Sequence, residues 1–196
     1  MFSRARSNNR NNIFTHNINF GMNLYPQKPQ PIQPIQTITD TSNKPKKMKW
    51  GEPTWFFLHT MAQKIKPEYF ETIRQGFLTQ ISSICRNLPC PDCANHAAHY
   101  LDNSNFNRIK TKDDLIVFLY EFHNTVNSKK GYPLFSKSEL NEKYSKANTM
   151  NIINYFIYHF TDKSKSIRMI SNDMFRMRII QLLKEWLNEN LQFFDA

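Results

Sequence analysis

Apolar residues recur along the middle of this chain at intervals of three and four positions, the period of an amphipathic helix. Between Pro67 and Pro89 they stand at Phe70, Ile73, Phe77, Ile81 and Ile84. No segment shows the strong alternation of apolar and polar residues that is typical of a strand. Glycine is scarce, with four in the chain, so tight hairpins should be rare. The pattern therefore predicts an all-α fold.

Turn and capping residues set the bounds of the expected helices. Pro53 suits the first turn of a helix that runs to about Lys64. Thr111 is a good N-cap with Asp114 three positions on, and Gly131 suits the end of that helix. Further helices are expected at 67–88, 91–101, 138–146, 149–160 and 166–193. We expect a helical bundle over 49–147 and a helical extension over 148–196.

The last expected helix carries an apolar stripe, and we expect this stripe to form either core or a dimer surface. Its members are Ile167, Ile170, Met174, Met177 and Leu182.

Residues 1–48 lack any periodic apolar face and are predicted to form a disordered, basic, proline-rich arm. Residues 1–49 hold eight Lys or Arg and one Asp, whereas the rest of the chain holds 18 basic and 15 acidic residues. Because the folded part is nearly balanced in charge, the net charge of +10 does not indicate a nucleic-acid interface on the domain.

The chain has no run of 18 apolar residues and no apolar segment after its first charges, so neither a transmembrane helix nor a secretory signal is expected. A cytoplasmic, non-secreted protein is predicted. Its three cysteines, Cys85, Cys90 and Cys93, lie within nine residues, which is not the disulfide framework of a secreted domain. Such a cluster indicates catalysis or metal binding.

Cys90 and Cys93 stand three apart at the expected start of a helix, where unpaired N–H groups favour a thiolate. Four chemistries use such a pair. Covalent haem attachment fails because alanine, not histidine, follows the second cysteine. Thioredoxin-like exchange needs a preceding strand. A zinc site would need Cys85 with His96 or His99, in one packed cluster rather than two separated knuckles. Flavin-coupled dithiol oxidation needs a cofactor pocket beside the pair.

Aromatic and polar residues on both sides of the cysteine pair offer such a pocket. Trp55 and His59 are four apart on one expected helix and therefore share a face. Gly51 would allow a ligand to approach the backbone closely. A second face carries His123, Asn124 and Asn127. Planar rings stack on adenine or isoalloxazine, and amides bond to ring edges.

At these residues the chain resembles the Erv/ALR family of FAD-dependent sulfhydryl oxidases, over about residues 49–146. The matching motifs stand in family order: Trp50-Gly51, Trp55-Phe56-Phe57-Leu58-His59, Cys90-Pro91-Asp92-Cys93 and His123-Asn124-Thr125-Val126-Asn127, then Lys129, Gly131, Pro133 and Phe135. The Asn- and Lys-rich composition and long tails resemble the versions in large DNA viruses.

The resemblance implies a four-helix up-and-down bundle with a short fifth helix, a homodimer, and FAD bound non-covalently at the mouth of the bundle. It makes Cys93 the cysteine that faces the flavin and Cys90 the one that accepts the incoming thiol. It implies no metal site. Tyr132 stands where many members have lysine. The implied FAD contacts are Gly51, Trp55, His59, His123, Asn124, Val126, Asn127, Lys129 and Tyr144.

The implied reaction oxidises protein thiols to disulfides with O2 as acceptor, giving hydrogen peroxide. Only Cys85 remains besides the pair, so the chain has no second pair to serve as a shuttle. Cys85 is predicted to be a buried helix cysteine, and the alternatives are that it resolves the active-site pair or bridges to a partner. Electrons would come from a separate substrate protein, such as a small thioredoxin-like carrier. If the protein is viral, the host cytoplasm or the virion would be its location. The alternative is a non-enzymatic helical module that uses zinc to anchor an assembly.

Overall fold

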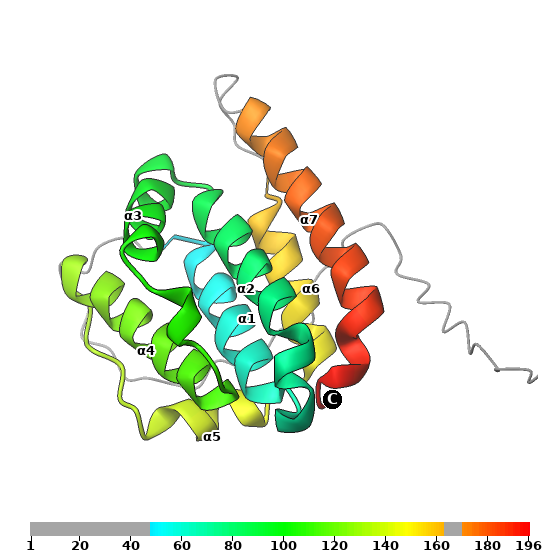
Figure 1. Ribbon diagram of the computed structural model, residues 1–196. Coiled ribbons are helices and arrows are strands. Elements are labelled where there is room, and N and C mark those ends of the chain that lie inside the picture. The colour runs from blue at the N-terminus through cyan, green and yellow to red at the C-terminus, as the bar shows by residue number, and fades with distance from the viewer. Residues whose placement is uncertain (1–47, 163–169) are drawn as a thin grey trace, which may run out of the picture.

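The computed structural model describes residues 48–162 and 170–196 (Figure 1). Its α-helices there are α1 (Gly51–Lys64), α2 (Phe70–Arg86), α3 (Pro91–Asp102), α4 (Lys112–Lys129), α5 (Glu139–Ser145), α6 (Thr149–Phe160) and α7 (Ile170–Asn190). Three 3-10 turns accompany them: η1 (Pro67–Tyr69), η2 (Phe106–Arg108) and η4 (Leu191–Phe193).

The all-α prediction is confirmed, since the described residues form no strand beyond one isolated bridge between Ile65 and Phe194. The predicted arm falls outside the described residues except for Met48, and so do residues 166–169 of the last predicted helix. In the described part of the chain, no helix combines the length and the apolar character needed to cross a membrane.

The capping residues act as the sequence predicts. The Thr111 hydroxyl accepts a hydrogen bond from the Asp114 N–H at 3.1 Å, and the Asp114 carboxylate accepts one from the Thr111 N–H at 2.9 Å. This reciprocal pair satisfies two backbone donors at the start of α4. Gly131 follows the helix with φ of 67°, a conformation that suits glycine.

Helix α1 lies at the centre of the core. It packs against α4, α5 and α6, while α2 packs against α3 and α7. The ring of Phe57 on α1 stacks on Phe156 of α6, with centroids 4.4 Å apart. Buried side chains from α1, α2, α4, α6 and α7 form one continuous apolar cluster. A smaller cluster gathers beside α5 around Phe135, Leu140 and Tyr144.

Residues near 195 tie the end of α1 to the start of α6. The Asp195 N–H donates to the Lys64 carbonyl at 2.7 Å, and the Thr149 hydroxyl donates to the Asp195 carbonyl at 2.8 Å. The Lys66 N–H also donates to the Phe193 carbonyl at 2.9 Å. These bonds fix the segment after α7 against the helix that carries Trp55.

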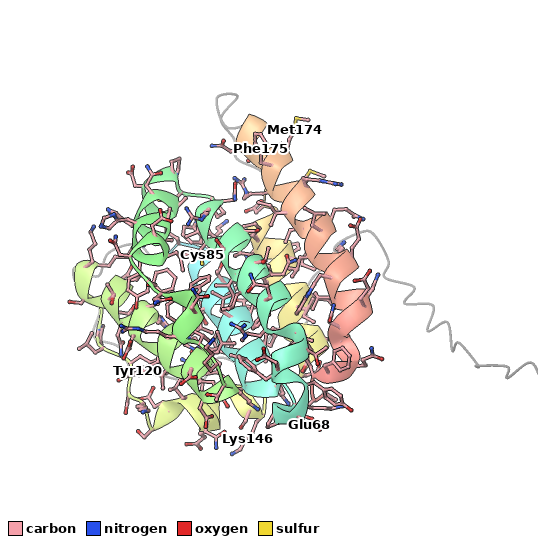
Figure 2. The ribbon with its side chains drawn as sticks, viewed as in Figure 1. Glu68, Cys85, Tyr120, Lys146, Met174 and Phe175 are labelled. Carbon is pink, nitrogen blue, oxygen red and sulfur yellow. The ribbon has the colours of Figure 1, made fainter. Side chains whose placement is uncertain are left out.

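The prediction that the stripe on the last helix might form core is wrong for its described members. Met174, Met177 and Leu182 are 67%, 56% and 42% exposed. Figure 2 shows Met174 on the end of α7 that projects past the body. The dimer-surface alternative stays a prediction. The side chains that are buried instead are Arg176, Ile180, Leu183 and Leu187.

The register of α7 explains this error. Its buried face begins with an ion pair between Arg176 and Asp173, and the Arg176 Nε donates to the Phe160 carbonyl at the end of α6 at 3.2 Å. Because these first two positions are charged, a search for apolar periodicity does not detect the buried face. It selects the exposed methionines instead.

Candidate active site

The cysteine pair begins helix α3. Cys90 is the N-cap, and its Sγ accepts a hydrogen bond from the Cys93 N–H at 3.3 Å. Pro91 occupies the first turn, where a missing N–H costs nothing. Both cysteines are half-buried, and they are not joined by a disulfide. The pair is therefore accessible from one side and held by the helix end on the other.

Cys93 is shielded more than a surface thiol. Burial, followed by its contact with Cys90, raises the pKa of Cys93 to about 11. The Lys130 ammonium, whose Nζ lies 3.7 Å from the Cys93 Sγ, acts in the opposite sense on that pKa.

Cys85 is a different kind of cysteine. It lies inside the body on α2 (Figure 2), and burial raises its pKa to about 12. The prediction of a buried helix cysteine is confirmed, and a thiol of this kind is inert toward exchange.

The two predicted ring-bearing faces meet. The indole of Trp55 on α1 stacks on the imidazole of His123 on α4, with centroids 4.1 Å apart. His59 stacks on Tyr144 of α5 at 4.7 Å. The His59 Nε2 and His123 Nδ1 atoms are hydrogen-bonded at 3.1 Å. These four side chains, Trp55, His59, His123 and Tyr144, are called the ring cluster below.

Both histidines of the ring cluster are held neutral. Burial, then His123 and Lys143, lowers the pKa of His59 to about 3. Burial, then Lys143, lowers the pKa of His123 to about 4. A hydrogen bond between two imidazole nitrogens also needs one nitrogen without a proton. At neutral pH the ring cluster is therefore uncharged. His59 and Tyr144 are buried, whereas Trp55 and His123 are half-buried and offer planar faces that suit stacking against an aromatic ligand.

The predicted amides bond to the chain that follows α4. The Asn124 Nδ2 donates to the Phe135 carbonyl at 3.0 Å, and its Oδ1 accepts from the Phe135 N–H at 2.8 Å. The Asn127 Nδ2 donates to the Pro133 carbonyl at 3.3 Å. These bonds hold the segment that brings Phe135 against His59 and His123, a positioning task that sequence spacing alone does not reveal.

The three remaining predicted cofactor contacts are not members of the ring cluster. A Cβ on Gly51 would meet no atom within 4 Å, so packing within the protein does not require glycine there. Val126 is partly buried against the core. The Lys129 Nζ lies 2.8 Å from the His96 Nε2 of α3. Helix α4 thus links the ring cluster, through His123, to the helix that carries the cysteines.

A surface depression of about 550 Å³ runs along the outer side of α4. Its lining includes Asn124 and Lys129, together with Leu134 from the following segment. Neither cysteine lines it, and neither does any member of the ring cluster. It is therefore not the place where the cysteine pair is exposed.

Two lysines were missed as site residues. One of them is Lys130, through its contact with Cys93. Lys143 places its Nζ 5.3 Å from the ring centroid of Phe56, 5.6 Å from Phe135 and 5.7 Å from Tyr144. Lys143 directly precedes the predicted contact Tyr144, and this position was a signal in the sequence. The other two rings that it contacts, Phe56 and Phe135, come from distant segments.

No group of three or more His, Cys, Asp or Glu side chains in the described part of the chain could hold a metal ion. The described residues thus supply no ligand set for the zinc alternative.

The chain is similar in sequence to FAD-linked sulfhydryl oxidases. Residues 52–145 match the model of the Erv1 / Alr family. A putative FAD-linked sulfhydryl oxidase of Invertebrate iridescent virus 3 is 29% identical over 96 residues, covering 48% of this chain and 65% of the relative. An FAD-linked sulfhydryl oxidase of Oryza sativa is 29% identical over 96 residues, 49% of each chain. An FAD-linked sulfhydryl oxidase of African swine fever virus is 27% identical over 108 residues, 55% of this chain and 89% of the relative.

The chain spans 65% of the length of the Invertebrate iridescent virus 3 relative and 49% of the length of the Oryza sativa relative. No solved structure matches it with statistical significance.

Proposed function

From the match of residues 52–145 to the model of the Erv1/Alr family, and from the similar sulfhydryl oxidases, we propose that the protein is an FAD-dependent sulfhydryl oxidase. The observation that carries the proposal is the half-buried pair Cys90 and Cys93 at a helix N-terminus, linked through α4 to a cluster of neutral, stacked rings. A reactive dithiol and a surface for a planar cofactor are the two parts that this chemistry needs.

The residues present fit FAD. The ring cluster offers aromatic faces, since Trp55 and His123 are only half-buried, and the open space at Gly51 leaves room for close approach to the backbone. The exposed ammonium of Lys129 suits a phosphate. The proposed FAD contacts remain Gly51, Trp55, His59, His123, Asn124, Val126, Asn127, Lys129 and Tyr144.

In the proposed reaction a substrate thiolate attacks Cys90 of the Cys90–Cys93 disulfide. The substrate sulfur bonds to the Cys90 Sγ, the disulfide breaks, and its electron pair remains on the Cys93 Sγ. A second substrate thiol then displaces Cys90, which leaves an oxidised substrate and a reduced pair. When bound, FAD would supply a two-electron acceptor for the reduced pair, with O2 as the final acceptor and hydrogen peroxide as the product.

The substrates in this proposal are protein thiols. Because Cys85 is the only cysteine of the chain besides the pair, no second cysteine pair relays electrons within the chain, and a small thioredoxin-like protein is the proposed carrier. A homodimer in the host cytoplasm or the virion completes the proposal.

The first experiment is an absorption spectrum of the purified full-length protein. We expect a flavin spectrum with about one FAD per chain, and a protein that is colourless and takes up no FAD would contradict the proposal. The second is turnover with dithiothreitol. Cys93→Ser should keep flavin and lose oxidase activity, whereas the matched control Cys85→Ser should keep both. Unchanged turnover in Cys93→Ser would show that the assigned role is wrong.

A further inference from the structure

A lysine at the end of α4 contacts the inner cysteine of the pair. Lys130 is the C-cap residue of α4, and its Nζ lies 3.7 Å from the Cys93 Sγ of α3. We propose that Lys130 is a positioning residue that stabilises the thiolate form of Cys93 and so favours Cys93 as the sulfur released when Cys90 is attacked. This inference rests on the proposed function, but its test does not require flavin or oxygen.

The backbone around Lys130 is fixed. Its N–H contacts the carbonyls of Val126 and Asn127, each at 3.1 Å, and the Gly131 N–H donates to the Ser128 carbonyl at 3.2 Å. The Tyr132 N–H donates to the Asn127 carbonyl at 2.9 Å. These hydrogen bonds hold the backbone on both sides of Lys130. They therefore fix the Cα position from which its half-buried side chain extends.

The neighbouring lysine shows that this contact belongs to the packing of two helices. The Lys129 Nζ lies 2.8 Å from the His96 Nε2, and His96 stands three residues after Cys93 on α3. Residues three apart lie on the same face of a helix. Two consecutive lysines at the end of α4 therefore reach one face of α3, and of the two it is Lys130 that reaches the sulfur.

The charges around Cys93 give this contact a chemical consequence. From α3, burial and the contact with Cys90 disfavour the thiolate; from the end of α4, the ammonium of Lys130 favours it. In disulfide exchange a sulfur that is more stable as an anion leaves faster. When the bond between substrate and Cys90 forms, the electron pair of the broken disulfide stays on the Cys93 Sγ beside Lys130. The lysine keeps its proton, so the step needs no proton transfer.

The test isolates one thiol. In a full-length Cys85→Ser/Cys90→Ser background, Cys93 is the only cysteine of the chain. The rate of its alkylation by iodoacetamide, measured against pH, reports its thiolate fraction. We expect Lys130→Met to alkylate about tenfold more slowly at a fixed pH below the pKa, the effect of losing an opposite charge at this range. Lys130→Arg should restore most of the rate.

Lys146→Met is the matched control, because it removes the same charge at an exposed position after α5 (Figure 2). It should alkylate at the rate of the background. Equal rates for Lys130→Met and Lys146→Met would overturn the proposal. So would a Lys130→Met variant whose Tm falls while its alkylation profile stays unchanged, since the lysine would then only stabilise the helix end. Absence of flavin from the protein would contradict the proposed function. The alkylation rates could still be interpreted, because their measurement does not require flavin.

Discussion

Helix α1 separates two regions that are built in different ways. Toward α6 it presents Phe57, which is fully buried and stacked on Phe156, within the main apolar cluster. Toward α4 and α5 it presents Trp55 and His59, which meet His123 and Tyr144. The first region is apolar and closed, whereas the second is aromatic, partly polar and partly open.

The difference indicates that the two faces of α1 have different roles. Burial of apolar surface on the α6 side stabilises the fold. On the other side, His59 and Tyr144 are also buried, whereas Trp55 and His123 are half-buried and form the surface proposed for the cofactor. Substitutions on the two faces should therefore separate stability from flavin binding.

Removal of the α6 side should have the largest effect. A chain ending at Ala147 would lose α6 and α7, and with them the partners of Phe57 and of Gly76. We expect no cooperative thermal transition by far-UV circular dichroism, because a large part of the core would face water. As a control, Met174→Ser in the full chain should change the free energy of unfolding by less than about 0.5 kcal/mol, since Met174 is exposed. A truncated chain that melts cooperatively and still oxidises thiols would show that 49–147 folds alone.

Two substitutions two residues apart on α1 sharpen the comparison. Phe57→Ala should lower the free energy of unfolding by about 3–5 kcal/mol, because it leaves a cavity in a closed core. Trp55→Ala should destabilise less, because the indole is half-buried, yet it should lose most of the bound FAD. Chemical denaturation and the ratio of flavin to protein absorbance measure the two effects. If Phe57→Ala loses flavin while remaining stable, the two faces are not divided as described.

Much of this arrangement follows from local sequence. Proline, the Thr111 capping box and Gly131 set helix bounds within a few residues, because each acts on neighbouring backbone groups. The meeting of Trp55 and His59 with His123 was also predicted from spacing and resemblance, since each motif lies on one helix face.

Contacts between distant segments could not be predicted in this way. The bonds from Asn124 to Phe135 depend on how the chain turns after α4, and the contact of Lys130 with Cys93 depends on where α4 ends beside α3. The buried register of α7 was missed because it starts with Asp173 and Arg176, which an apolar pattern does not count.

Gly76 is another residue whose role appears only in three dimensions. It lies in the middle of α2, where glycine usually costs about 1 kcal/mol relative to alanine. A Cβ there would stand 2.5 Å from the Trp186 Nε1 of α7. The indole cannot move away freely, because it stacks on Phe77 with centroids 5.6 Å apart. Glycine thus permits the close approach of α2 and α7.

The smallest predicted effect is that of Gly76→Ala on the free energy of unfolding, which should change sign when Trp186 is replaced. Gly76→Ala should destabilise the full chain by about 1–2 kcal/mol, since overpacking outweighs the gain in helix propensity. In a Trp186→Leu background the same substitution should stabilise by about 0.5–1 kcal/mol, because only the gain in propensity remains. A double-mutant cycle by urea denaturation measures both values. Equal destabilisation in the two backgrounds would mean that Trp186 is not the residue that requires glycine at position 76.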